Sequence, residues 1–146
     1  HRAVETIQHI PYRCNTVKVH AVHDGAVNTE VVLDLGEGQH LVAIVTKDSA
    51  HRLGLAAGKS AWALIKASWP ILVKGAAPAT SARNTLCGTV KAITAGAVNT
   101  EVVLGLKGGA ELVVMITTGS EKTLGLTVGD AVCALIKATH VILGVD

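Results

Sequence analysis

The feature that most constrains the fold is an internal repeat with a shift of 71 residues. Val19 corresponds to Val90 and Lys66 to Lys137, and the match runs without a gap as far as Leu72/Leu143. About half of the paired positions are identical, which is the pattern of an internal duplication. A chain of 146 residues is long enough for two small domains. We therefore expect two tandem copies of one fold.

Each copy has the same pattern of short apolar runs separated by glycine turns. In the second copy, Ser120 is expected to cap a helical turn and Gly125 to end it. The strands are expected at 85–94, 99–106, 111–117, 132–137 and 141–145, with the helical turn at 120–124. Five strands with one helical turn after the third predict an all-β fold of two tandem OB-type five-stranded Greek-key barrels.

The repeat also sets the expected domain boundaries. Residues 1–73 form the first barrel, with 1–11 as an irregular lead-in in which Val4, Ile7 and Ile10 could line a short helical turn. Residues 74–80 are small and include a proline, which is typical of a linker. Residues 81–146 form the second barrel.

The strands are apolar on both faces. Leu112 and Val114 would point to one side of their strand, and Val113 and Met115 to the other. A half-exposed strand alternates apolar with polar residues, and a small barrel has only one interior. Outward apolar residues of this extent need cover from another barrel, within the chain and between chains. The pattern predicts a homo-oligomer.

Composition excludes several classes of function. The chain has no Phe, one Tyr and two Trp, a formal net charge of +2 and no block of like charges. Proteins that bind single-stranded nucleic acid stack bases on aromatic residues and follow phosphates with a basic groove, so this class is disfavoured. No apolar run approaches the length of a membrane span, and the polar start does not resemble a signal peptide. We expect a cytoplasmic protein with no membrane partner.

Cysteine and histidine give no metal or catalytic pattern. Three cysteines without C-x-x-C spacing argue against a disulfide framework or a zinc site, and Cys87 and Cys133 are expected to be small core residues. No paired carboxylates, Ser-His-Asp set or Cys-His pair repeats in both copies, so we expect no enzyme. No histidine has a counterpart in the other copy; the seven are His1, His9, His20, His23, His40, His51 and His140.

Several of the polar residues that do repeat are hydrogen-bond donors. Each copy has a Gly-Ala-Val-Asn turn, a Thr-x-x-Ser pair and a Lys-Ala pair. The residues are Asn28/Asn99, Thr46/Thr117, Ser49/Ser120, Lys66/Lys137 and Ala67/Ala138. Hydroxyls, turn N–H groups and an ammonium together suit a tetrahedral oxyanion. Ser81 and Arg83 extend this set in the second copy, and arginine offers a planar fork that matches oxyanion oxygens.

Each of these residues also has an ordinary structural explanation. Thr46 and Thr117 end strands, and Ser49 and Ser120 could simply cap helical turns. Lys66 and its counterpart could extend to solvent from a strand end. The occurrence of the whole set in two copies at fixed spacing favours function over these separate explanations.

At this point the chain resembles a known family, the Mop domains of the molbindins. The motifs are Ser81-Ala82-Arg83-Asn84, Gly96-Ala97-Val98-Asn99, Thr117-x-x-Ser120, Leu124-Gly125-Leu126 and Ala134-Leu135-Ile136-Lys137-Ala138. They occur in order at the right spacing, and the resemblance covers Val19 to Asp146. Two fused copies resemble a di-Mop protein.

The resemblance implies OB-type barrels, a trimer of two-domain chains, and molybdate or tungstate bound at subunit boundaries without an organic cofactor or direct protein–metal ligands. One kind of site would use Ser81, Arg83, Thr117, Ser120, Lys137 and the Ala138 backbone. In the first copy the counterparts would be Thr46, Ser49, Lys66 and Ala67. The turns would contribute Val27, Asn28, Val98 and Asn99 to sites near the three-fold axis.

The first copy departs from the family pattern at its start. Ile10-Pro11-Tyr12-Arg13 stands where the second copy has Ser81-Ala82-Arg83-Asn84. The hydroxyl is absent and the arginine comes one place late, so the two copies need not bind equivalently.

Besides nucleic-acid binding, which the composition disfavours, two functions remain possible. The main one is storage or buffering of molybdenum as an oxyanion. The other is the oxyanion-sensing C-terminal domain of a molybdate-responsive transcription regulator, although no helix-turn-helix is evident in these residues. The sequence does not rank molybdate against tungstate.

Overall fold

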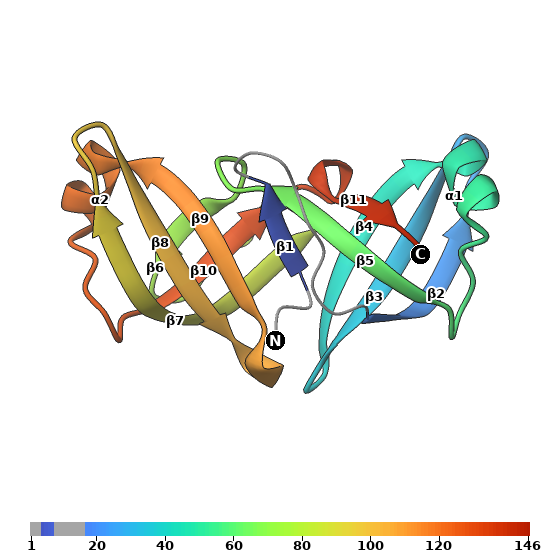
Figure 1. Ribbon diagram of the computed structural model, residues 1–146, viewed down its shortest axis with the longest axis horizontal. Coiled ribbons are helices and arrows are strands. Elements are labelled where there is room, and N and C mark those ends of the chain that lie inside the picture. Colours follow the sequence, from blue (N-terminus) through green and yellow to red (C-terminus); the bar gives the residue numbers. More distant parts are fainter. Residues whose placement is uncertain (1–3, 8–16) are drawn as a thin grey trace.

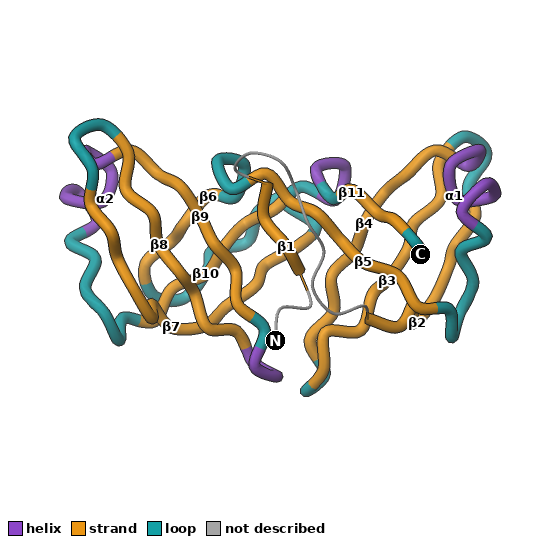
Figure 2. Tube along the Cα trace, in the orientation of Figure 1, coloured by secondary structure: helices purple, strands orange, loops and turns teal. Residues whose placement is uncertain are grey.

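Two curled β-sheets lie side by side in an elongated molecule, with a short helix at each end (Figure 1). The computed structural model describes residues 4–7 and 17–146. This confirms the all-β fold class, and Figure 2 shows how little helix accompanies the strands.

The strands of the second copy lie close to where the sequence places them. They are β7 (Asn84–Ala95), β8 (Asn99–Leu106), β9 (Glu111–Thr117), β10 (Ala131–Ile136) and β11 (Ile142–Gly144). The 3-10 turn η1 (Lys107–Gly109) joins β8 to β9, α2 (Thr118–Leu124) follows β9, and η2 (Ala138–His140) follows β10.

The first copy repeats this order. Its elements are β2 (Val17–Asp24), β3 (Asn28–Gly36), β4 (Gln39–Thr46), α1 (Lys47–Leu53), β5 (Ser60–Lys66) and β6 (Ile71–Lys74). Even the irregularities are duplicated: the ladder between the first two strands shifts register between Val19 and Ala21, and between Val90 and Ala92. Gly54 and Gly125 end the helices with φ of 64° and 61°, a left-handed conformation that glycine adopts without steric cost.

The last strand of each copy is exchanged between the two sheets. β6, from the first copy, pairs with β10 of the second, whereas β11, from the second copy, pairs with β5 of the first. The sheet orders are β1-β5-β2-β3-β4, with β11 also on β5, and β6-β10-β7-β8-β9. The duplicated strands offer similar pairing surfaces, so exchange costs little.

Because of this exchange, the expected domain boundaries do not coincide with the boundaries between the two sheets. The boundary at 74–80 separates the repeats in sequence, but residues 71–74 belong to the second sheet and residues 142–144 to the first. Lys74 closes β6 and is therefore a strand residue and not part of a linker.

The start of the chain also differs from expectation. Part of the lead-in expected at 1–11 is a strand, β1 (Val4–Ile7), which pairs in parallel with residues 63–66 of β5. In the second copy, β7 covers the corresponding edge of β10 along its full length. In the first, the described part of β2 pairs with residues 60 and 61, and β1 pairs with residues 63–66. The helical turn suggested for Val4 and Ile7 is therefore wrong; Ile10 lies outside the described residues.

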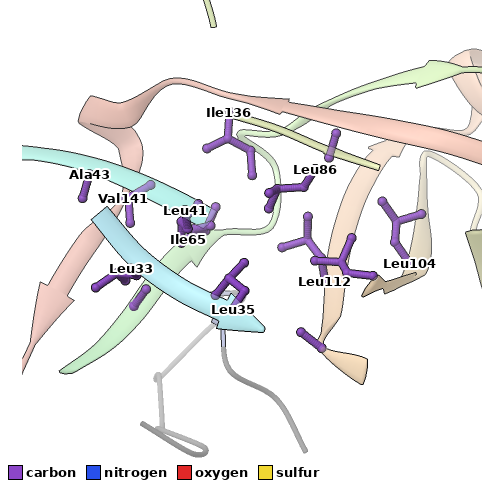
Figure 3. Packing of buried hydrophobic residues seen from close by; sticks show 14 of the residues in the cluster. Leu33, Leu35, Leu41, Ala43, Ile65, Leu86, Leu104, Leu112, Ile136 and Val141 are labelled. Carbon is purple, nitrogen blue, oxygen red and sulfur yellow. The ribbon is translucent and has the colours of Figure 1, made fainter. Parts of the chain in front are cut away.

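The hydrophobic core is continuous between the two sheets. Figure 3 shows side chains from both copies in one cluster, including Leu41 and Ile65 from the first and Leu86 and Leu112 from the second. On the outside of the first sheet, Ala138 covers Val32 and Val42, which are 8% and 5% exposed. The expectation that outward apolar residues pack against the other copy is met here within one chain.

The prediction for two cysteines was wrong. Cys87 and Cys133 stand directly opposite each other on β7 and β10 and form a disulfide. Cys133 is buried as expected, but Cys87 is exposed. Count and spacing along the chain carry no information about cross-strand register, which is what brings these two residues together.

Candidate anion-binding site

The Thr-x-x-Ser pairs form the first turn of each helix. Thr117, and not Ser120 as expected, is the N-cap of α2: its Oγ1 accepts the N–H of Ser120 at 3.0 Å and donates to the Ser120 Oγ at 2.8 Å. Thr46 and Ser49 repeat both contacts at 3.1 and 2.8 Å at the start of α1. The extended backbone of the threonine places its side chain over the free N–H groups of the helix. Each copy thus presents two adjacent hydroxyls at a strand end.

The asparagine turns adjoin these hydroxyls. Asn99 pairs with Thr117 in the β8–β9 ladder, and Asn28 with Thr46 in the β3–β4 ladder. The turn residues Val27 and Val98 are 74% and 72% exposed. The family resemblance implies different sites for the turns and the Thr-x-x-Ser pairs, whereas the structure makes them neighbours.

A pocket of about 780 Å³ lies beside α2 and combines residues of both copies. Its polar lining includes Asn99, Thr117 and Ser120 from the second copy and Ser68 from the first. Ser68 lies there because the segment between β5 and β6 crosses to the second sheet, where the Ala67 carbonyl accepts the Met115 N–H at 2.8 Å. Among the described lining residues, none is Ser81, Arg83 or Lys137.

Sequence reasoning missed Ser68. A signal for it existed, because the corresponding residue in the other copy is Thr139, so a hydroxyl follows the Lys-Ala pair in both copies. A hydroxyl at this position is thus a further repeated donor, although the residue type differs between the copies.

The alanines of the two Lys-Ala pairs contact opposite sheets. Lys66 precedes the buried Ala67 on the second sheet, and its ammonium stands 5.9 Å from the centre of the Trp69 ring. Lys137 is exposed and precedes Ala138, which is buried on the first sheet. The strand exchange therefore places each pair against the copy to which it does not belong.

Arg83 lies over the outer face of the first sheet. Its Nη2 is 3.6 Å from the Glu30 Oε1 of β3, with both side chains partly exposed. Beside it is an open pocket of about 590 Å³ lined by three histidines, His20, His23 and His40. The His20 and His40 rings stack with centroids 4.7 Å apart. At the corresponding positions of the second copy, Lys91 and Glu111 form a 2.9 Å ion pair.

A single chain thus separates the residues expected in one site. Arg83 and Lys137 emerge together, because the β7–β10 ladder ends at the pair Asn84–Ile136 and these are the next residues. Thr117 and Ser120 lie at the start of α2, at one end of the molecule in Figure 1, and line a pocket that Arg83 does not line. Within one chain, the residues that the sequence prediction places in one site are therefore divided between two places.

Two further observations concern other classes of site. Within residues 4–7 and 17–146, no three His, Cys, Asp or Glu side chains are placed to hold a metal ion. In the same part of the chain, no helix is long and apolar enough to cross a membrane.

Comparison with known proteins gives a consistent family. The TOBE domain matches twice, over residues 16–72 and 80–143. The molybdenum-pterin-binding protein MopA of Rhodobacter capsulatus is 46% identical over 90% of this chain and 49% of its own length. The molybdenum transport protein ModE of Azotobacter vinelandii is 41% identical over 83% of this chain and 45% of its own. The chain therefore spans about half the length of these two relatives.

A solved structure matches along its whole length. It is the cytoplasmic molybdate-binding protein ModG with molybdate bound, which is 45% identical and superposes with a TM-score of 0.86. The match covers 96% of this chain and 100% of that one. Together with the two TOBE matches, the tandem fold and the resemblance to Mop domains, this establishes that the chain belongs to the TOBE domain family, with two Mop-like copies in tandem.

Proposed function

We propose that the chain binds molybdate or tungstate as an intact tetrahedral oxyanion and carries out no chemistry on it. The observation that carries this proposal is the full-length similarity to ModG with molybdate bound. The duplicated Thr-x-x-Ser hydroxyls, the Asn turns and the paired Arg83 and Lys137 supply donors and positive charge suited to such an anion. Storage or buffering of molybdenum in the cytoplasm is the role that fits a binder without a catalytic set.

We further propose that the sites form between chains of a homotrimer. Two observations support this. Arg83 and Lys137 lie apart from the Thr117–Ser120 pocket in one chain, so another chain has to bring such groups together. In addition, large apolar residues are exposed at equivalent positions of both copies: Val27 and Val98, and Ile71 and Ile142, at 74%, 72%, 64% and 44%. A partner chain would bury them.

A second role has a specific observation in its favour. The ModE match covers less than half of that protein, so the same tandem unit can form part of a longer chain. In that case the chain would be the oxyanion-sensing part of a regulator. Both roles require the same binding sites, and the sequence of the full open reading frame decides between them.

Calorimetric titration with molybdate, tungstate and sulfate, combined with particle mass by light scattering, tests the proposal. We expect uptake of the first two anions by a particle of three 15.0 kDa chains. A particle of one chain that takes up neither molybdate nor tungstate would exclude it.

Two variants test the assigned residues. Arg83→Ala and Lys137→Ala should weaken molybdate binding without unfolding the chain, because both side chains are exposed and charge-assisted bonds to the anion would be lost. Lys107→Ala, in the turn between β8 and β9, is the matched control and should bind like the unchanged protein. Normal binding by both site variants would overturn the site assignment.

A further inference from the structure

Asn84, the first residue of β7, makes an unusual contact with the other copy. Its amide oxygen accepts the N–H of Val42 at 2.7 Å, and its amide nitrogen donates to the carbonyl of the same residue at 2.7 Å. Asn84 is only 3% exposed. Its side chain thereby satisfies both backbone groups of Val42 on β4, the last strand in the order of the first sheet. The side-chain amide thus makes the two hydrogen bonds that one residue of a paired neighbouring strand would make.

This contact fixes the chain where two cationic residues emerge. Arg83 immediately precedes Asn84, and Asn84 pairs with Ile136, the residue before Lys137. Ala138, next in the chain, is 4% exposed and packs on Val42 as well. Val42 is therefore contacted both by Asn84, the neighbour of Arg83, and by Ala138, the neighbour of Lys137.

We propose that Asn84 is a positioning residue for oxyanion binding: by clamping Val42 it fixes the backbone from which the Arg83 guanidinium reaches the anion. This inference rests on the proposed function. A guanidinium binds an oxyanion through a planar fork, so its orientation matters as much as its charge. Because the clamp orders the backbone of Arg83 on folding, less ordering remains to be done when the anion binds.

The clamp also makes the two copies unequal. Arg13 occupies the position in the first copy that corresponds to Asn84. A guanidinium has no acceptor atom, so it cannot accept a backbone N–H as the amide oxygen of Asn84 does. In the part of the chain that the structure describes, Asn84 forms the one such clamp, and we expect the two copies to contribute sites of different affinity.

A double-mutant cycle with Arg83 tests the proposal. In the otherwise unchanged protein, Asn84→Ala should weaken molybdate binding about tenfold, an effect typical of residues that orient a ligand. In the Arg83→Ala background the same change should alter the affinity by less than about twofold, because the group that Asn84 positions is gone. A purely structural role predicts equal effects in both backgrounds, and this result would overturn the proposal.

Two further variants separate positioning from stability. Asn84→Asp keeps the size of the side chain but cannot donate to the Val42 carbonyl, so its affinity should also fall. Val90→Ala, in the core of the second sheet, should lower the melting temperature while leaving the affinity unchanged. An Asn84→Asp protein that binds as tightly as the unchanged one would contradict the inference.

A readout that needs no ligand completes the test. The order parameter of the Arg83 side-chain Nε–H group, measured by NMR relaxation, should drop in Asn84→Asp relative to the unchanged protein. An unchanged order parameter would contradict the clamp. If the unchanged protein binds no oxyanion, the proposed function fails; if it binds and the Asn84 variants match it, only this inference fails.

Discussion

At the scale of single residues, the Gly-Ala-Val-Asn turns show why particular side chains recur in both copies. The N–H of Gly25 donates to the Asn28 carbonyl at 2.8 Å, and that of Gly96 to the Asn99 carbonyl at 2.9 Å. A Cβ atom on Gly25 or Gly96 would come within 2.8 or 2.6 Å of the same carbonyl oxygen. Glycine is required here by the close approach of backbone atoms, and the turn places Asn99 opposite Thr117.

We predict that Gly96→Ala lowers the free energy of unfolding by about 1–3 kcal/mol, because the new methyl group has to displace backbone. Chemical denaturation measures the change. Gly119→Ala is the control: it lies in α2, where a Cβ atom would meet nothing closer than 4.0 Å and alanine favours the helix. Equal stabilities for the two variants would show that the turn tolerates a side chain at residue 96.

At the scale of elements, the turn before β10 links the exchanged strand to its host sheet. Asp130 accepts the N–H of Thr127 at 2.9 Å and its hydroxyl at 3.1 Å. Lys74, at the end of β6, lies 3.5 Å from the same carboxylate and donates to the Gly125 carbonyl at 3.0 Å. The backbone hydrogen bond from Thr127 is the main reason that the pKa of Asp130 lies below its usual value.

The sign of the resulting pH dependence follows from this shift. Since folding lowers the pKa, the stabilisation is complete above the unfolded-state pKa of about 3.9 and is lost as pH falls through the lower folded-state value. Asp130→Asn should therefore melt at a lower temperature than the unchanged protein at pH 6, and the difference should shrink at pH 3. A difference of the same size at both pH values would contradict this assignment.

The disulfide joins β7 and β10 across a sequence separation of 46 residues. Thiol titration of the denatured protein without reductant should detect one of the three cysteines, Cys14, and titration after reduction should detect all three. Replacing Cys87 and Cys133 by Ser should lower stability by roughly 3–4 kcal/mol, the loop-closure term for this length. Three free thiols before reduction would contradict the disulfide. Cys87 and Cys133 would then be neighbouring reduced thiols, the state in which a reducing compartment keeps cysteines.

At the scale of the whole molecule, the exchange of β6 and β11 ties the two copies into one unit. Each sheet is completed by a strand from the other copy, and one core runs between them (Figure 3). The proposed sites depend on this exchange, because it carries Ser68 to α2 and Ala138 to the first sheet.

Removing residues 142–146 tests the exchange. Because β11 pairs with residues 62–64 of β5, their amides in the first sheet should lose protection from hydrogen exchange, while those of β10 should keep it. Removing only residues 145–146 is the control. Loss of protection in β10 instead would mean that β11 pairs within its own copy.

Much of the fold could be predicted from the sequence because the strand patterns and glycine turns occur in both copies. The bounds expected for β8 and β9 are those observed, and Gly125 ends α2 as expected. The exchange could not be predicted, since a repeated strand pairs equally well with either copy. The strand at β1 was missed because four residues are too few to show a period, and the disulfide because register is not encoded by spacing.

The residues of the candidate site stay a prediction, and one chain brings together only part of the expected set. Thr117 and Ser120 do lie together, as do Thr46 and Ser49, because each pair is local in sequence. Their separation from Arg83 depends on which sheet receives which strand. Nothing in the sequence assigns a role to Asn84, because its partner, Val42, is 42 residues away in the other copy.

A crystal soaked in tungstate is the most direct test of the claim that hydrogen-bond donors from different copies bind an oxyanion. Anomalous scattering locates tungsten without reference to the protein. We predict peaks beside the Thr117–Ser120 hydroxyls and near the guanidinium of Arg83, at contacts between chains. Tungsten peaks remote from all these groups, or none at millimolar tungstate, would contradict it.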